Sequence, residues 1–482
     1  MAERTESTES AETPRLADRT AGRPAVRATT QRDPATGELP AVFRGTILHF
    51  LRDPGADDDP DAWELFEDGA LAVGADGTVR WAGEWSALPE QHRGTVIDHR
   101  GKLIVPGFVD AHIHYSQYDM IASFGAQLED WLQEYVFPAE RRFADKDYAE
   151  RVSGLFLDTL LACGTTTASV FPSVHATSVD AFCAQARRRG MRMTCGKVLM
   201  DKQPEAPDFL SDASLAQAEE QTRQLIARWH GTDRLTYAIT PRFALSSTDE
   251  QLAMAARLFH EFPGVALQTH AAESLPETAS VLDRFTDARS YLDVYDRAGM
   301  LDARSLFDHC VHIDDQDRSR MAATGAAIAF CPTSNLFLGS GLFDLAAARD
   351  AGIRVGLGTD CGGGTSYSLL RTLNEAYKVV MLKESTKPED QRTSLSARRG
   401  FYLATLGGAE ALYLDDHIGN FRPGKEADFV ILDWAATPVL ARRTEVARDF
   451  QERLFAQMIL GDDRSVVATY VMGRRAYART AE

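Results

Sequence analysis

The hydrophobic pattern between residues 106 and 410 alternates short apolar runs with longer stretches of amphipathic spacing. The short runs are rich in β-branched and aromatic residues, which is typical of buried strands. The stretches between them repeat apolar residues every three or four positions, as at Leu215, Ala218 and Leu225, which is typical of helices packed on a core. Strands are predicted over residues 108–114, 165–171, 192–200, 235–243, 265–270, 306–313, 326–332 and 355–360.

The alternation of these eight strands with helices predicts a (β/α)8 barrel of the TIM-like kind over residues 106–410. In one connecting segment, Ser247 and Glu250 have the spacing of a capping box, which predicts the start of a helix. An open, doubly wound parallel sheet is the alternative arrangement. Because no G-x-G-x-x-G motif follows the first strand, we favour the barrel.

Both flanks of this region show a different pattern, in which strand-like runs follow one another across tight turns. In the N-terminal flank, Asp76-Gly77 lies between two such runs and predicts a hairpin turn. The C-terminal flank contains the similar runs EADFVILD and SVVATYVMGRRAYA. We expect the two flanks, residues 39–105 and 411–482, to pair with each other and form one small β-sandwich.

The composition narrows the class of protein. A chain of 482 residues with a net charge of −18 is unsuited to binding nucleic acid or an anionic membrane surface. No apolar run reaches the roughly 20 residues of a membrane span. The six cysteines include no C-x-x-C motif, which favours a reduced, cytoplasmic protein. Residues 1–38 contain few large apolar side chains and no hydrophobic segment of a secretory signal, so we expect a disordered tail there.

Residues that can bind a metal recur where the predicted strands end. His112 and His114 close the first strand and, two residues apart, point to the same side. His270 closes the fifth strand and Asp360 the eighth, and the C-terminal strand ends of a barrel form one site. Three imidazoles and one carboxylate suit a single zinc ion that activates water. His309, within the sixth strand, is better suited to orienting that water. For any one of these histidines, an ordinary core position is the alternative.

A second group of residues suits a substrate beside such a metal. Glu273 follows the fifth strand and could act as general acid and base, although a glutamate favoured at a helix N-terminus is the alternative. Arg242 and Gln117 offer hydrogen-bonding groups, while Phe243 and Trp131 offer flat apolar surface. Together they suit a heteroaromatic ring with a carbonyl and ring nitrogens. Alternatively, Arg242 pairs with an acidic residue and Trp131 belongs to the core.

Several segments resemble one known family. They are PGFVDAHIHYSQY, WLQEYVFPAE, GTTTASVF, ITPRF, CPTSNLFLGSG, GLGTD followed by GGGTSYS, and LATLGGAEALYLDDHIGNFRPGKEADFVIL. In this order, over roughly residues 41–433, they resemble the guanine deaminases, zinc enzymes of the amidohydrolase superfamily. The chain departs from the family's pattern at Ala271-Ala272, where the family usually carries more polar residues, and this could shift the ring preference. The segment before about residue 41 matches nothing.

The resemblance implies the hydrolysis of guanine to xanthine and ammonia, in purine catabolism, by an enzyme that is commonly a homodimer. It implies one zinc ion per subunit, activated water that attacks the amine-bearing ring carbon, and Glu273 as the proton shuttle. The implied zinc ligands are His112, His114, His270 and Asp360. The implied substrate-binding residues are Gln117, Trp131, Arg242, Phe243, Glu273 and Asp360. The implied catalytic residues are Glu273, Asp360 and His309.

Two other kinds of function stay open at this point. A related amidohydrolase acting on 8-oxoguanine, a pterin or a triazine would keep the same metal ligands and differ in its pocket. An inactive amidohydrolase scaffold that binds protein partners would be expected to lose at least one ligand. This chain retains every ligand, which disfavours the scaffold.

Overall fold

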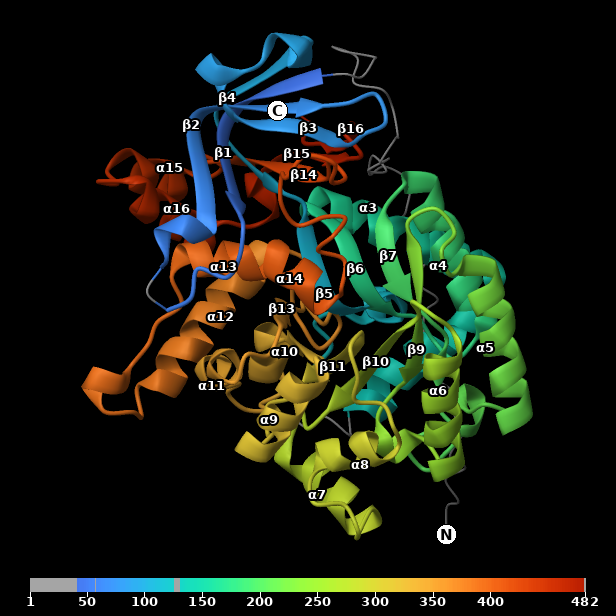
Figure 1. Ribbon diagram of the computed structural model, residues 1–482. Helices are drawn as coiled ribbons and strands as arrows, with labels where there is room; N and C mark the ends of the chain where they lie inside the picture. The colour runs from blue at the N-terminus through green and yellow to red at the C-terminus, as the bar shows by residue number, and fades with distance from the viewer. Residues whose placement is uncertain (1–40, 57, 125–130, 481–482) are drawn as a thin grey trace, which may run out of the picture.

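Eight parallel strands form the centre of the molecule (Figure 1). The structure is a computed structural model that describes residues 41–480 except residue 57 and residues 125–130, so the tail predicted at residues 1–38 lies outside the described residues. Hydrogen bonds join neighbouring strands in the order of the chain. The strands are β5 (Phe108–His114), β6 (Thr165–Phe171), β7 (Arg192–Cys195), β9 (Leu235–Pro241), β10 (Ala266–Ala271), β11 (Ser305–His309), β12 (Ala327–Phe330) and β13 (Val355–Leu357).

The ring of strands closes between β5 and the segment after β13. The backbone N–H of Asp360 donates to His112 O at 2.9 Å, and the N–H of His114 donates to Cys361 O at 3.0 Å. These bonds continue the parallel ladder from the last strand back to the first. The predicted (β/α)8 barrel is therefore confirmed. The run predicted at 192–200 is interrupted, because its second part forms a separate short strand, β8 (Val198–Leu199), which pairs with the end of β9.

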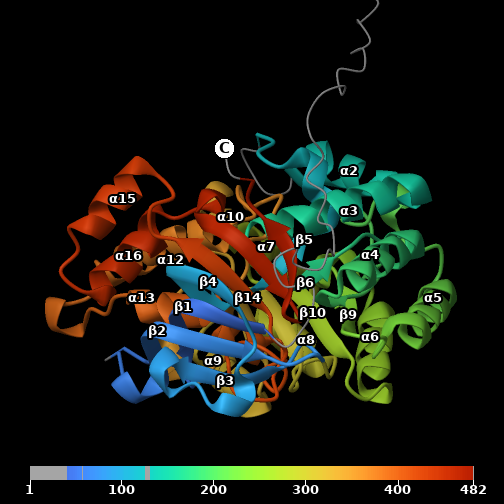
Figure 2. The same ribbon diagram turned by 90° about the horizontal axis from the view of Figure 1, so that it is seen from above.

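Helices cover the outside of the barrel (Figures 1 and 2). Helix α5 (Leu215–Trp229) buries Ala218, Leu225 and Ile226, the face that the apolar spacing predicts. The other helices of this region are α2 (Phe137–Arg141), α3 (Lys146–Ala162), α4 (Ala176–Arg189), α6 (Asp249–Glu261), α7 (Leu275–Arg284), α8 (Tyr291–Arg297), α9 (Asp315–Thr324), α10 (Pro332–Phe337), α11 (Leu345–Asp350), α12 (Leu369–Glu384), α13 (Ala397–Leu403) and α14 (Leu406–Ala411).

The start of α6 differs from the prediction by one residue. Thr248, not Ser247, is the N-cap, because its Oγ1 accepts a hydrogen bond from the N–H of Gln251 at 3.2 Å. The physical reason is a tertiary contact: Asp201 accepts hydrogen bonds from both the N–H and the hydroxyl of Thr248, each at 2.7 Å. The capping box predicted for Ser247 and Glu250 is therefore wrong.

Both ends of the described chain meet in a second sheet beside the barrel, where the blue N-terminal strands lie next to the red C-terminal ones (Figure 2). This pairing of the two flanks confirms the prediction from their patterns. Hydrogen bonds run through seven strands in the order β16 (Arg474–Ala478), β15 (Val466–Val471), β14 (Phe429–Asp433), β4 (Thr95–Pro106), β1 (Ala41–Phe50), β2 (Trp63–Val73) and β3 (Val79–Glu84).

The second sheet curls over an apolar core of its own. The ring centroid of Phe429 lies 4.7 Å from that of Phe43 and 4.5 Å from that of Tyr470, so strands from both ends of the chain share one cluster. The expected sandwich is thus one continuous mixed sheet folded on itself. Between β14 and β15 lie two helices that the pattern did not predict, α15 (Pro438–Glu445) and α16 (Phe450–Leu460), and α16 packs on α12 and α13.

A buried group of charges joins the sheet to the base of the barrel. Arg192 at the start of β7 and Arg234 just before β9 both donate to the carboxylate of Glu426. Arg234 also pairs with Asp428 at 2.6 Å. Paired charges with little exposure fix the orientation of the sheet on the barrel, because separating them would leave charges without partners.

The helices of the described residues include none with the length and hydrophobicity of a membrane span.

Candidate active site

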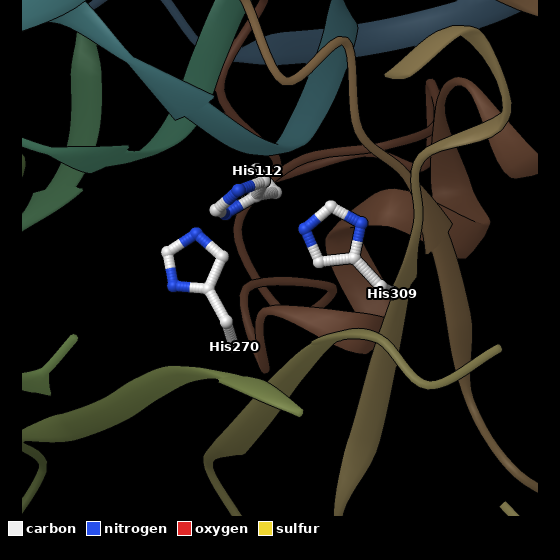
Figure 3. A group of neighbouring side chains, drawn as sticks. All are labelled: His112, His270 and His309. Carbon is white, nitrogen blue, oxygen red and sulfur yellow. The ribbon is translucent and has the colours of Figure 1, made fainter. Parts of the chain in front are cut away.

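The predicted metal ligands converge at the C-terminal end of the barrel. His112 and His114 lie on β5, His270 lies on β10 and His309 ends β11, while Asp360 follows β13. Figure 3 shows His112, His270 and His309 pointing toward a common centre. His309 and Asp360 adopt positive φ values of 70° and 48°, which side chains other than glycine rarely take. Such backbone strain is typical of functional sites.

The spacing of the ligand atoms fits a single metal ion. The Nε2 atoms of His114 and His270 lie 3.1 Å apart. Asp360 Oδ1 lies 3.1 Å from His112 Nε2 and 3.3 Å from His114 Nε2. Zinc bonds of about 2.0–2.1 Å in tetrahedral geometry would place ligand atoms about 3.3–3.4 Å apart, close to these separations. Although Asp360 Oδ1 lies close to it, buried His112 Nε2 makes no well-directed hydrogen bond among the described residues, as expected of two atoms that share a metal.

The charge balance also favours a cation at this centre. Burial lowers the pKa of His114 to about 3 and that of His270 well below its usual value, so both imidazoles are neutral at pH 7, as metal ligands must be. At His112 burial also opposes the charged form, but the carboxylates of Asp308 and Asp360 outweigh it and raise its pKa to about 10. The two carboxylates thus stabilise positive charge at the point where the imidazoles converge. Three imidazoles together with the Asp360 carboxylate form a set of donors that fits a divalent metal.

Two residues near the centre that the strand pattern did not identify hold the imidazoles in place. Asp308 Oδ2 lies 3.0 Å from His112 Nδ1, on the side of the ring away from the ligand atom. Asn335, at the end of the CPTSN segment, contacts His309 Nδ1 through Nδ2 at 2.9 Å. Such contacts fix the orientation of an imidazole. One ring nitrogen each of His112, His270 and His309 lie within 4.8 Å of one another, so the geometry also allows His309 as a ligand, a role that the sequence did not assign to it.

Glu273 lies beside the same group of side chains. It lies on the loop between β10 and α7, after Ala272 with its positive φ of 49°. Its Oε2 lies 3.6 Å from His309 Nε2, and its Oε1 accepts a hydrogen bond from Ser340 Oγ at 3.0 Å. The N–H of Glu273 donates to Glu277 Oε2 at 3.0 Å. Both the backbone and the carboxylate of Glu273 are therefore held in one position.

The predicted substrate residues line a cavity of about 300 Å³ above the candidate metal ligands. Gln117, Trp131, Arg242 and Phe243 lie in its wall together with Glu273, Asp360 and three of the histidines. The cavity extends down to the converging histidines, since His114, His270 and His309 also line it. The structure therefore brings every site residue predicted from the sequence to this cavity except His112, which lies directly beneath it.

The two residues predicted to form hydrogen bonds with a substrate ring share one buried partner, Glu140 on α2. Arg242 Nη1 donates to both oxygens of Glu140, at 2.9 and 2.8 Å. Gln117 Nε2 donates to Glu140 Oε1 at 3.1 Å, while Gln117 Oε1 accepts from the N–H of Gly362 at 3.2 Å. Arg242 thus pairs with an acid, the alternative considered above, and lines the cavity as well. No local spacing in the sequence points to Glu140, although it ends the WLQEYVFPAE segment.

Comparisons with known proteins agree with this geometry. A model of the amidohydrolase family matches residues 103–476. Guanine deaminase of Escherichia coli (strain K12) is 49% identical over 444 residues, which cover 91% of this chain and 98% of that protein. A solved structure of E. coli guanine deaminase superposes with a TM-score of 0.85 at 47% identity, over 91% of this chain and 100% of the other. Guanine deaminase from C. acetobutylicum, with guanine bound in its active site, superposes with a TM-score of 0.82 at 27% identity, over 91% of this chain and 100% of the other. The chain therefore belongs to the amidohydrolase family and, within it, to the guanine deaminases.

Proposed function

We propose that this protein hydrolyses guanine to xanthine and ammonia and uses one zinc ion per subunit. The observation that carries the proposal is the position of Glu273, whose carboxylate lies 3.6 Å from His309 in the wall of a cavity that Arg242, Gln117 and Phe243 also line. A proton-transferring group and a ring-binding wall thus face the same centre. The activity of the E. coli relative and the guanine bound by the C. acetobutylicum enzyme support the choice of substrate.

The metal would be held by His112, His114, His270 and Asp360. Zinc bound there would supply an activated water near neutral pH, because it lowers the pKa of water to about 7. Burial opposes the ionisation of Asp360, but His112 and His114 outweigh it and hold the pKa of the Asp360 carboxyl well below its usual value. Asp360 therefore stays an anion that can accept a hydrogen bond from the attacking water.

Proton transfer falls to Glu273. Its carboxylate takes a proton from water as the oxygen bonds to the ring carbon that carries the amine. One proton of the water ends on the ring nitrogen beside that carbon, and the other ends on the amine. Because amide ion is a very poor leaving group, the C–N bond breaks only after the amine is protonated, which releases ammonia. Ser340 keeps the Glu273 carboxylate aimed at this path through the hydrogen bond to Oε1.

The ring is held by the wall of the cavity. Phe243 and Trp131 offer flat surfaces for the faces of a purine, and Arg242 and Gln117 offer donors for its carbonyl and ring nitrogens. His309 Nε2 lies 3.8 Å from Asp360 Oδ2 and would orient the attacking water between them.

We also propose that the enzyme is a cytoplasmic homodimer. Beyond its second subunit it binds the purine substrate, and it binds neither nucleic acid nor a membrane. For its organisation we propose the boundaries expected above, with the barrel over residues 106–410 between the two flanks.

A substrate panel with metal analysis on the same sample tests the proposal. Guanine, 8-oxoguanine, a pterin and a triazine would be compared by kcat/KM, and zinc would be counted per chain. We expect guanine to have the highest kcat/KM, about one zinc per chain, and loss of ammonia release after chelation. A higher kcat/KM for one of the other rings would assign the protein to a different substrate. Ammonia release that survives complete removal of the metal would contradict the role of zinc.

A further inference from the structure

Glu140 is a fully buried carboxylate beside the substrate cavity that no step of the proposed reaction uses. It comes from α2, the helix that follows the cavity-lining residues Trp131 and Leu132. A buried carboxylate without hydrogen-bond partners is strongly unfavourable, so the partners of Glu140 indicate its role. Its partners are Arg242 and Gln117, which reach it from the end of β9 and from the 3-10 helix η4 (Tyr115–Met120) after β5. Both partners line the cavity.

The contacts of Glu140 determine which groups its partners present. The Arg242 guanidinium makes two hydrogen bonds to the described residues. Nη1 donates both of them, and both go to Glu140. Nε and Nη2 of Arg242 make no hydrogen bond to the described residues, and Arg242 lines the cavity. The amide of Gln117 has its orientation set at both ends, since Nε2 donates to Glu140 and Oε1 accepts from the N–H of Gly362. This part of the cavity wall therefore presents N–H donors and positive charge.

We propose that Glu140 is a positioning residue that makes the pocket select purines with a carbonyl group, by holding Arg242 and Gln117 as donors. The proposal rests on the proposed function and specifies how that site chooses its ring. Hydrogen-bond donors in the cavity wall pair with the oxygen of a ring carbonyl. They interact unfavourably with an amine, because an amine is also a donor. The pocket thus favours 6-oxopurines over purines that lack the oxygen or carry an amine in its place.

Binding of two rings that cannot be deaminated tests the proposal without involving turnover. Hypoxanthine has the carbonyl and lacks the amine of guanine, and unsubstituted purine lacks both. Calorimetric titration of the zinc-loaded enzyme would give a Kd for each ring. Because a hydrogen bond to a charged group is worth a factor of about 10–100, we expect hypoxanthine to bind at least about 10-fold more tightly than purine. In Glu140→Gln we expect that ratio to fall below about 3-fold, with the zinc content unchanged.

Two further variants separate positioning from general stability. Glu426→Gln removes a carboxylate that also pairs with two arginines, but at the opposite end of the barrel, so it should lower stability and leave the Kd ratio unchanged. If Glu140→Gln does not fold, Glu140→Asp keeps the charge and withdraws it by one methylene, and we expect an intermediate ratio.

Each outcome decides between the explanations. An unchanged ratio in the folded Glu140 variant, or equal Kd values for the two rings in the parent, would overturn the inference. Absence of ammonia from guanine with the parent enzyme would instead contradict the proposed function, while the Kd ratio would still report on Glu140. For kcat and KM with guanine, we expect Glu140→Gln to raise KM about 10-fold or more and to change kcat much less, a split that a loss of folded protein would not produce.

Discussion

The Nε2 atoms of His114 and His270 lie 3.1 Å apart, although one imidazole belongs to β5 and the other to β10. Their ring planes are nearly parallel, with 17° between them. Burial lowers the pKa of both imidazoles, so neither carries a positive charge at neutral pH. Two neutral rings that the strands of the barrel hold at this separation can share one cation.

Removal of one of these imidazoles should therefore remove the metal. In His114→Ala we expect zinc affinity to fall by at least about 100-fold, more than the loss typical of residues that only orient a ligand. Ammonia release should fall with it. Zinc per chain after dialysis against a weak chelator measures the effect. His417→Ala changes an exposed histidine remote from the cavity and should retain zinc. Full zinc content in His114→Ala would refute the ligand assignment.

The carboxylate of Glu273 should be needed for turnover and not for metal binding. We expect Glu273→Gln to retain zinc and to lose about 10²–10⁴-fold in kcat, because the amide cannot accept and return a proton. Steady-state rates of ammonia release on zinc-quantified samples measure this. Glu205→Gln changes another glutamate of the cavity wall and should keep kcat near the parent value. A Glu273→Gln enzyme as fast as its parent would rule out the shuttle.

Glu277 should make the stability of the protein depend on pH. Burial, together with the charge of Glu273, raises the pKa of Glu277 from 4.5 to about 7. The folded state then holds a proton that the unfolded state has released, so stability is highest below pH 4.5 and falls as pH rises toward 7. Between pH 5 and 7 the loss is about 2 kcal/mol in the free energy of unfolding.

The variant Glu277→Gln isolates this contribution, because it cannot titrate there. Urea unfolding of both proteins at pH 5 and pH 7 gives the comparison. We expect the parent to lose about 2 kcal/mol more than the variant over this interval. Parallel behaviour of the two proteins would show that Glu277 is already ionised in the folded state at pH 5.

The charges between barrel and sheet should affect stability alone. Arg234 pairs with both Glu426 and Asp428, and it lies at the strand ends opposite the cavity. In Arg234→Met we expect a loss of about 3–5 kcal/mol in the free energy of unfolding, because buried Asp428 loses its arginine partner and Glu426 keeps only Arg192. The kcat and KM for guanine, measured well below the unfolding temperature, should stay unchanged. A KM that shifts in this variant would indicate that the sheet affects the cavity.

The position of each candidate metal ligand could be predicted, because it depends on a local pattern at the end of one strand. A buried strand that ends in a histidine or an aspartate indicates where that side chain points once the barrel is known. Glu140 could not be found in this way. It lies 102 residues from Arg242 along the chain, and their contact depends on where α2 packs. The same limit explains the wrong capping box, since Asp201, a residue of another segment, selects Thr248 as the cap.

The flanks show a further limit of pattern reading. Alternating strands and turns predicted that the two ends of the chain pair, and they do. The order of the strands and the curl of one sheet around Phe43 and Phe429 depend on contacts between the ends. The strand-like runs of the C-terminal flank did not predict the helices α15 and α16, which lie within residues 438–460 between β14 and β15.

The pairing of β4 with β14 has a consequence during translation. Ile104 lies opposite Ile431, and Lys102 contacts Asp433, which lies 331 positions further along the chain. A ribosome therefore exposes β4 long before it makes the strand that covers that edge. An unprotected strand edge is a template for aggregation. The edge of β4 therefore stays uncovered until residues 429–433 have been synthesised, and a premature stop before Phe429 would leave it uncovered permanently.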